Sequence, residues 1–152
     1  MCNPNTGMEF IGGLLQTCRL AVLATEGSGQ PYASLIAITP FCGFREMIFA
    51  TYRNTLKFEN LKLNARVAVL VQGEYMDSSG QNKVFALTAF GHAEELAISE
   101  LEEAVNAHRE RHPDVANLLQ SSESAMVRIK VETYQIVRGI DDVTWLNVED
   151  SG

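Results

Sequence analysis

Residues 47–72, MIFATYRNTLKFENLKLNARVAVLVQ, constrain the fold more than any other part of the chain. They open with a short apolar run that ends at Thr51, pass through a polar bend, continue at helical spacing, and return to a β-branched run at Val67. This pattern is typical of a strand, a helix and a second strand. The helix then begins at the polar bend, where Asn54 or Thr55 can cap it.

Donor groups gather at this bend, because Arg53, Asn54, Thr55 and Lys57 surround the start of the helix. The first backbone N–H groups of a helix have no partner within it, and the helix dipole is positive at that end. Such a corner attracts a phosphate or a carboxylate. The alternative is an ordinary surface corner with capping side chains and solvated cations.

The composition indicates an ordinary globular protein. With 152 residues, 46% hydrophobic and 20% charged, we expect one domain over residues 1–152. The net charge of -7, without a run of Lys or Arg, argues against nucleic acid as a partner. No signal-peptide pattern opens the chain, and no apolar run approaches the roughly 18 residues of a membrane span, so we expect a cytoplasmic protein that does not enter the membrane. Cys2, Cys18 and Cys42 are odd in number and lack CxxC spacing, which favours reduced thiols.

The rest of the chain favours strands joined by hairpins, with helices between them. A capping box over residues 6–9 predicts a first helix, and residues 20–25 and 32–39 read as a hairpin whose second strand pairs with the strand at 47–51. Residues 73–83 read as a long polar loop that could cover a site, and residues 84–92 as a strand. A second capping box over residues 99–102 predicts a helix that stops before Pro113, with a short helix near 115–119 and strands at 125–138 and 143–148. We expect about seven strands and three or four helices, in an α+β, mainly antiparallel split β-barrel with peripheral helices.

Three segments carry a resemblance to a known family. They are LAVLATEGSGQPYASLIAIT, MIFATYRNTLKFENLKLNARVAVLV and ALTAFGHAEEL, which follow one another in this order. The chain resembles, over roughly residues 10–147, the pyridoxamine 5'-phosphate oxidase-like superfamily of FMN-binding split β-barrels. The resemblance implies FMN at a homodimer interface, with its phosphate at the corner described above. The site suggested by the residues and the site of the family coincide.

The resemblance also implies which residues bind FMN. Ser34, Leu35, Ile36 and Ala37 would follow the edge of the isoalloxazine ring, and Thr51 and Tyr52 would contact the ring or the ribityl chain. Arg53, Asn54, Thr55 and Lys57 would lie near the phosphate. The cofactor-binding residues that we predict are Ser34, Leu35, Ile36, Ala37, Thr51, Tyr52, Arg53, Asn54, Thr55, Lys57, Gln72 and Trp145.

The chain departs from the family in two places. Residues 32–36, YASLI, lack the second basic residue that the family often has there, and VRGIDDVTWLNVEDSG lacks the Arg-and-His pattern of true pyridoxamine 5'-phosphate oxidases. Vitamin B6 oxidation is therefore not the activity that we expect. The hypothesis is an FMN-dependent oxidoreductase acting on an unidentified small molecule, without a nominated catalytic residue because the flavin carries the redox chemistry. The alternative is a non-enzymatic FMN-binding carrier, store or sensor, and F420 and haem are less favoured ligands.

Several other residues have two interpretations. His108 and His112 could share a metal, but no third ligand is evident, and a structural helix end is the favoured reading, so we predict no metal site. His92 could bind haem, although a solvated or hydrogen-bonded strand histidine is favoured. Trp145 could stack on a flavin across the interface or pack as a core or dimer contact. The glutamates between residues 94 and 103 are expected to form a solvated helix face.

Overall fold

The computed structural model describes residues 9–139 and 141–148. Its strands are β1 (Leu20–Gly27), β2 (Gln30–Ala37), β3 (Thr39–Phe41), β4 (Glu46–Tyr52), β5 (Arg66–Met76), β6 (Asn82–Glu95), β7 (Ser124–Gly139) and β8 (Asp142–Asn147). Its helices are α1 (Glu9–Gln16), α2 (Leu56–Leu63), α3 (Ile98–Arg111), the short 3-10 helix η2 (Pro113–Val115) and α4 (Ala116–Gln120). The predicted strand, helix and strand within residues 47–72 are confirmed as β4, α2 and β5.

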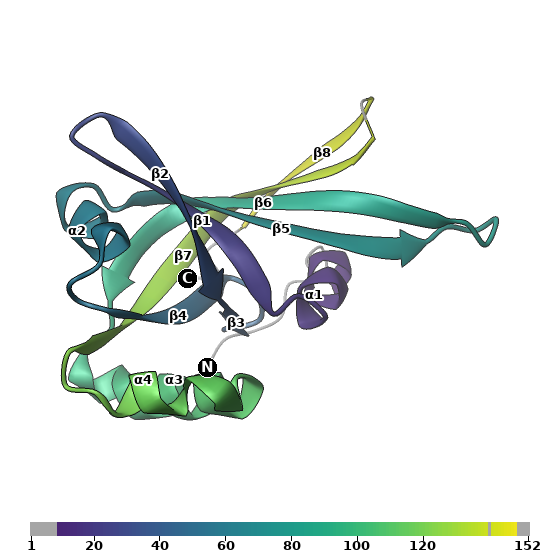
Figure 1. Cartoon of the computed structure of the whole chain (residues 1–152). Coiled ribbons are helices and arrows are strands. Elements are labelled where there is room, and N and C mark those ends of the chain that lie inside the picture. Colours follow the sequence, from purple (N-terminus) through teal and green to yellow (C-terminus); the bar gives the residue numbers. More distant parts are fainter. Residues whose placement is uncertain (1–8, 140, 149–152) are drawn as a thin grey trace.

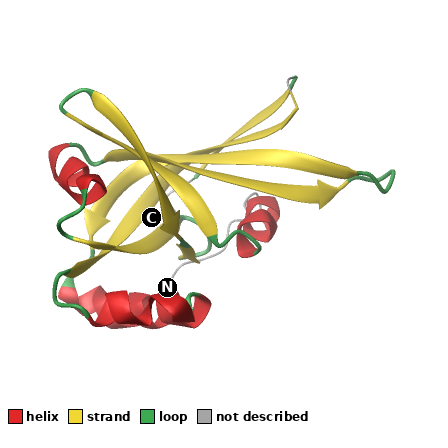
Figure 2. Cartoon of the chain, in the orientation of Figure 1, coloured by secondary structure: helices red, strands yellow, loops and turns green. Residues whose placement is uncertain are grey.

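The strands form one antiparallel sheet that curls on itself (Figures 1 and 2). Their order is β2-β1-β5-β6-β7-β4-β3, and β8 pairs with the end of β7 that extends past β4. In the described part of the chain β2 pairs with β1 alone, so the barrel stays open beside β2. The predicted α+β split barrel is confirmed, and Pro31 lies on an edge strand, where a missing N–H does least harm.

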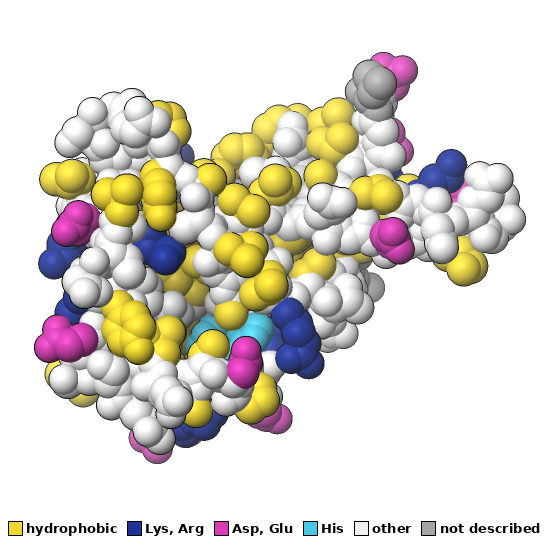
Figure 3. All heavy atoms as spheres, viewed as in Figure 1, with side chains coloured by type: hydrophobic (Ala, Val, Ile, Leu, Met, Phe, Trp, Pro, Cys, Tyr) yellow, Lys and Arg dark blue, Asp and Glu magenta, His cyan; other side chains and the backbone are white. Residues whose placement is uncertain are grey.

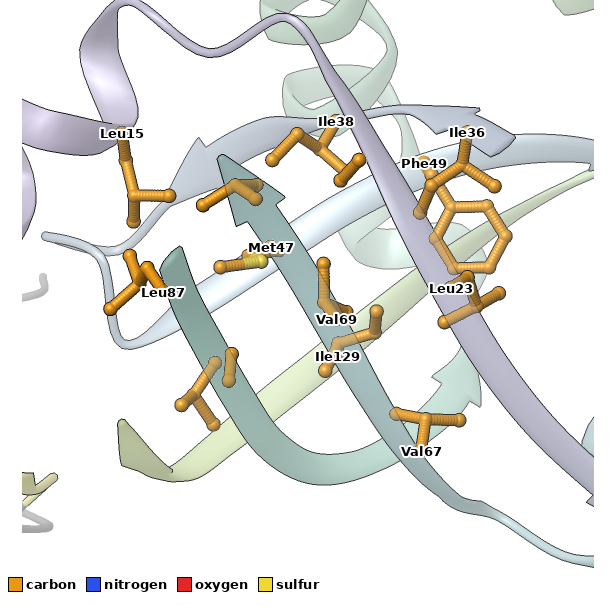
Figure 4. Packing of buried hydrophobic residues seen from close by; sticks show 14 of the residues in the cluster. Leu15, Leu23, Ile36, Ile38, Met47, Phe49, Val67, Val69, Leu87 and Ile129 are labelled. Atoms are coloured by element: carbon orange, nitrogen blue, oxygen red, sulfur yellow. The ribbon is translucent and has the colours of Figure 1, made fainter. Parts of the chain in front are cut away.

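The sheet has a buried inner face. Along β1 and β5 every second side chain is buried, which is the period-two pattern of a strand with one face in a core. Figure 4 shows Leu23, Val67 and Val69 converging with Met47 and Phe49 from β4. Helix α1 adds Ile11, Leu14 and Leu15 to this core, whereas α3 covers a smaller apolar cluster around Ile48 and Met126.

The predicted long loop at residues 73–83 is largely wrong. Strand β5 continues to Met76 and β6 begins at Asn82, so that only residues 77–81 form the turn. Asp77 organises this turn, because its Oδ1 accepts from the Ser79 N–H at 2.9 Å and the Gln81 N–H at 3.0 Å. The two strands, with the β7–β8 hairpin beside them, extend beyond the barrel as an arm (Figure 1).

Two further predictions about the strands hold in part. The described strands number eight where about seven were expected, because the second predicted strand breaks at Ile38 into β2 and β3. The predicted pairing of residues 32–39 with 47–51 holds at its end, where Thr39 of β3 lies opposite Ile48, whereas β2 does not pair with β4, whose other neighbour is β7. The break turns the chain across the split, since Ile38 still donates its N–H to the Arg19 carbonyl at 3.1 Å on the β1 side.

The helices agree with the predicted order but not with every predicted cap. Thr55 caps α2, as expected for one of two candidates. Helix α3 begins at Ile98 with Ala97 as a cap that makes no side-chain hydrogen bond, so the predicted capping box at 99–102 is wrong. The first predicted capping box lies mostly outside the described residues. None of the helices in the described part is long and apolar enough to cross a membrane.

The cysteines differ from expectation. Cys42 lies in the turn between β3 and β4, at a positive φ of 53°, and is disulfide-bonded, so the prediction of reduced thiols is wrong for this residue. Cys18 is a buried free thiol, as expected. Cys2 lies outside the described residues.

Candidate functional site

Residues 51–57, which we call the α2 corner, join β4 to α2. Two hydroxyl groups hold it together. Thr55 Oγ1 accepts the Phe58 N–H at 3.3 Å and donates to the Tyr52 carbonyl at 2.9 Å. Thr51 Oγ1 lies 3.1 Å from Thr55 Oγ1. The corner is therefore fixed before any ligand arrives, and the amino end of α2 is presented beside it.

Lys57 lies in the first turn of α2 and is half-buried. Burial lowers the pKa of its ammonium group, and no charged group among the described residues offsets that effect. A partly desolvated cation without a carboxylate gains free energy when an anion reaches it. Together with the helix dipole, Lys57 makes the corner suitable for a phosphate.

Arg53 already has a partner. Its guanidinium donates to both carboxylate oxygens of Glu95, at 2.8 and 2.7 Å, and lies 5.6 Å from the Phe58 ring centroid. The ion pair raises the pKa of Arg53 and lowers that of Glu95. Asn54 and Tyr52 are exposed on the same corner. Arg53 thus shares the corner with Lys57, but its side chain is held toward the end of β6 by Glu95.

The predicted residues on β2 alternate between the two faces of the sheet. Ile36 is buried in the core, and Leu35 is 64% exposed on the outer face. Ala37 is half-buried. The Ser34 hydroxyl oxygen is buried and has no hydrogen-bond partner among the described residues. Because β2 is an edge strand, backbone groups on its open side are also available to a ligand.

Gln72 and Trp145 lie on the outer face of the sheet. Gln72 follows the buried Val71 on β5 and is exposed, and Trp145 on β8 is 57% exposed. The indole stacks on Phe90 with 5.7 Å between ring centroids. The fold therefore places Leu35, Gln72 and Trp145 on one face of the sheet, and Thr51, Thr55 and Lys57 at its corner.

Of the glutamates predicted to form a solvated helix face, Glu102 and Glu103 are exposed on α3 as expected, whereas the others have a different arrangement. Glu94 and Glu95 end β6, and Glu94 shares Arg128 with Glu100 from α3. Arg128 is 14% exposed on its side chain and also lies 3.8 Å from Glu46, whose pKa is raised by burial. Sequence reasoning missed these partners, because they come from strands far apart in the chain and no local spacing signals them.

The histidines at the end of α3 have structural hydrogen bonds. His108 Nδ1 lies 2.8 Å from Thr39 Oγ1, and His112 Nε2 lies 2.6 Å from the Ile38 carbonyl, with both rings buried. Arg111 beside them donates to the Leu15 and Cys18 carbonyls. These contacts agree with the structural interpretation of the helix end. His92 is the solvated strand histidine that we favoured, 40% exposed and 3.9 Å from Glu132.

Solved structures share this fold. The chain aligns with a heme-binding protein from Mycobacterium smegmatis at 18% identity and a TM-score of 0.80, covering 97% of this chain and 60% of that one. It aligns with HutZ, a heme storage protein from Vibrio cholerae, at 19% identity and a TM-score of 0.67, covering 81% and 88%. The General Stress Protein 26 from Bacillus anthracis aligns at 18% identity and a TM-score of 0.71, covering 95% and 100%.

The three identities are low, and these likenesses establish the fold alone. The chain spans 60% of the length of the mycobacterial protein. No curated protein sequence is significantly similar to it. The family model described as pyridoxamine 5'-phosphate oxidase matches residues 9–138, almost the whole described barrel, and the chain therefore belongs to the pyridoxamine 5'-phosphate oxidase-like family.

Proposed function

We propose that the protein is an FMN-dependent oxidoreductase acting on a small molecule, with FMN bound at a homodimer interface. The observation that carries this proposal is Lys57, a half-buried ammonium group without a carboxylate partner in the first turn of α2. A phosphate monoester supplies the missing negative charge and accepts hydrogen bonds from a helix start.

Strand β2 supports the rest of the cofactor. The pyrimidine side of a flavin ring carries N–H and C=O groups, which match the alternating donors and acceptors on the open edge of a strand. The Ser34 hydroxyl, buried and without a partner among the described residues, is a further group that a polar ligand would satisfy. In this arrangement Lys57 holds the phosphate, and β2 orients the ring.

The outer face of the sheet supports a homodimer. Registered pairs place Leu35 opposite Val22, and Val22 opposite Leu70. Leu20, Leu70 and Trp145 are 57%, 42% and 57% exposed, and hydrophobic side chains gather on the exterior over β1, β5 and β6 (Figure 3). Isolated exposed apolar residues are common, but a continuous apolar sheet face marks an interface. A second copy of the chain would cover this face, and it would also contact the side of the isoalloxazine ring that points away from the first subunit.

The chemistry follows from the cofactor. Bound FMN would supply hydride or single-electron transfer, while the protein binds it, orients it and limits access of water. We assign no catalytic residue. The substrate would enter where the ring face stays open, beside the outer face of the sheet.

A second function is favoured by the names of two structural neighbours, which are described as heme-binding and heme storage proteins. The alternative proposal is therefore a non-enzymatic binding protein that carries, stores or senses its ligand. FMN remains our ligand for this alternative, with haem or F420 as outcomes that the experiment separates.

The test is the visible spectrum of the purified protein, followed by mass analysis of the released chromophore. FMN supports the proposal, whereas haem or F420 overturns it. An anaerobic titration with NADH and NADPH then separates the two functions. Bleaching of the oxidised flavin band within seconds supports an oxidoreductase, and a spectrum unchanged by both donors supports the binding protein.

A further inference from the structure

A pocket of about 200 Å³ lies between α2 and the ends of β6 and β7. It is lined by Phe58, Leu61, Lys62, Ala93, Glu94, Glu95 and Val127. None of the residues predicted to bind FMN is among them. The pocket is therefore distinct in its lining from the cofactor site proposed above.

The floor of the pocket is apolar. Phe58, Ala93 and Val127 are buried, with 4%, 6% and 1% of their surface exposed, and Leu61 is half-buried beside them. A cavity of about 150 Å³ lined by aliphatic and aromatic side chains is large enough for a benzene ring. The floor thus suits one ring or one short branched chain.

The charges at the rim favour an anionic head group. Arg53 donates to the Glu95 carboxylate from both terminal nitrogens of its guanidinium. Arg128 donates to Glu94 Oε1, and the Lys130 Nζ lies 3.7 Å from the same oxygen. Lys62 has no ion pair with any described residue, and its ammonium lies 5.0 Å from the Phe58 ring centroid. Glu95 is thus paired with Arg53, while Glu94 shares Arg128 with Glu46 and Glu100. Lys62, whose charge also lowers the pKa of Glu95, is the basic residue of the lining and makes no ion pair within 4.0 Å among the described residues. Figure 3 shows acidic, basic and hydrophobic side chains together on the side of the molecule that carries α2.

We propose that this pocket is a second small-molecule site, which takes a monocarboxylate with a compact apolar body. The body lies on Phe58, Leu61 and Val127, and the carboxylate reaches the Lys62 ammonium. The ordered start of α2 presents the site, because Thr55 fixes the Phe58 N–H. The inference goes beyond the proposed function and does not require bound FMN.

Benzoate, benzamide and benzylamine are suitable probes, since they share a ring and differ in charge. We expect saturable amide shifts of the lining residues in ¹H–¹⁵N spectra, with benzoate dissociation constants on the order of 1 mM for a ligand of this size. Benzoate should bind about two- to fivefold more tightly than benzamide, as expected for an exposed ion pair. Benzylamine should bind most weakly. Equal binding of the three probes, or no saturable shift at the lining residues, overturns the proposal.

Two pairs of variants, each with its control, locate the site. Leu61→Trp places a ring in the pocket and should weaken benzoate binding at least about tenfold. Leu63→Trp, at a residue 69% exposed and outside the lining, should leave it unchanged. Lys62→Met should weaken benzoate binding about two- to fivefold and leave benzamide binding unchanged. Lys83→Met is the control and should leave the binding of both probes unchanged. The lysine pair keeps the test valid if Leu61→Trp fails to fold. An unchanged benzoate affinity in Lys62→Met would overturn the proposed contact between the carboxylate and Lys62.

The same titration is run on flavin-loaded and flavin-free protein. Benzoate shifts confined to the α2 pocket in both forms support a separate site. Shifts that vanish when flavin is bound would place the probe in the cofactor site and overturn the proposal. A protein without flavin that still binds benzoate would leave this inference standing while the proposed function failed.

Discussion

Lys57 is the residue on which the cofactor proposal depends, because its charge is partly desolvated and has no partner among the described residues. A phosphate there gains charge-assisted hydrogen bonds, each worth roughly 1.5–3 kcal/mol. We predict that Lys57→Met lowers FMN affinity about ten- to a hundredfold and leaves riboflavin affinity nearly unchanged, since riboflavin has no phosphate. Fluorescence titrations with both flavins measure this contrast.

Lys62→Met is the matched control, because Lys62 lies on the same helix but is exposed and lines the other pocket. It should leave both flavin affinities unchanged. Equal losses for FMN and riboflavin in Lys57→Met would mean that Lys57 supports the fold or the ring. No loss for FMN would move the anion site away from the α2 corner.

His108 links stability to pH. Burial, followed by the nearby charges of His112 and Arg111, lowers its pKa from 6.5 to about 4. Between these two pKa values, His108 is protonated in the unfolded chain but neutral in the folded chain. The stability that this residue contributes is therefore fully present above its unfolded pKa, and it is lost as the pH falls toward its folded pKa. We predict that the free energy of unfolding falls by about 2 kcal/mol between about pH 7 and about pH 5.

Urea unfolding at several pH values measures this slope. His108→Asn can keep a hydrogen bond to Thr39, and it should be less stable but should lose most of the slope. His92→Asn changes an exposed histidine and should retain the slope. Above about pH 5 the carboxylates with lowered pKa values, such as Glu95, contribute little to the pH dependence of stability. They are already largely ionised there in both the folded and the unfolded chain. An unchanged slope in His108→Asn would contradict the assignment.

Sequence reasoning succeeded at residues whose role is local. Thr55 could be predicted as a cap, and Lys57 could be placed in the first turn of α2, because both depend on positions within one turn of the helix. The Arg53–Glu95 pair could not be predicted, since 42 residues separate its members and the fold alone brings them together. The disulfide of Cys42 was missed because cysteine spacing carries no information about distant pairing.

Among the elements, the pairing of β6 with β7 contains a bulge opposite Gly91, where the register skips Glu132 of β7. The register with β7 shifts between Phe90 and Gly91, and a Cβ at Gly91 would lie 2.0 Å from the Lys130 carbonyl oxygen. Backbone cannot yield as a side chain can, so we predict that Gly91→Ala destabilises the protein by about 3 kcal/mol or more. Chemical unfolding measures the change.

Gly13 provides the opposite case for the same substitution. It is exposed within α1, and a Cβ there meets nothing within 4 Å among the described residues. Gly13→Ala should stabilise the protein by about 0.5–1 kcal/mol through helix propensity. Similar losses in both variants would mean that the bulge tolerates a side chain and that the strand pairing near Gly91 is looser than the structure indicates.

The turn of the arm should tolerate shortening. The pairs from Tyr75 opposite Lys83 inward do not depend on residues 77–81. We predict that replacing residues 77–81 by Asn-Gly, which suits a two-residue hairpin, changes the melting temperature by only a few degrees. Circular dichroism measures this. Insoluble protein would show that the turn is required for folding.

The element predictions failed where tertiary pairing overrides local pattern. The polar run at 73–83 predicted a loop, yet Glu74 and Tyr75 are paired with β6 along the arm. The polar and glycine residues of this run hide its strand character in the sequence, although burial along β5 still alternates there and Tyr75 packs against the core beside Phe85. The pairing of β4 with β7 was equally invisible, since hairpin order favours neighbours in sequence.

At the scale of the whole molecule, the outer face of the sheet carries exposed apolar side chains that no other described element covers. It combines apolar residues of the adjacent strands β2, β1 and β5 with Trp145 of β8, which stacks on Phe90 of β6. A stable obligate interface commonly buries more than about 2,000 Å² and is apolar at its centre. We therefore expect the flavin-bound protein to be a dimer with twice the 16.8 kDa mass of the chain.

Leu70→Glu tests this face without touching a residue that we assign to the cofactor. Leu70 is 42% exposed and lies between Val22 and Thr88 in the strand register. A carboxylate there would be buried without a partner in the dimer, which is costly, but it would be solvated in the monomer. We predict that light scattering gives a mass near 16.8 kDa for the variant. The variant should lose FMN in parallel, because the partner subunit no longer contacts the ring.

Ile98→Glu is the matched control, since Ile98 is 90% exposed on α3. This variant should leave both the mass and the bound flavin unchanged. If Leu70→Glu stays dimeric with FMN bound, the outer face is not the interface. If the unmutated protein is a flavin-bound monomer, the dimer proposal is wrong, and the α2 corner and the edge of β2 must hold the cofactor alone.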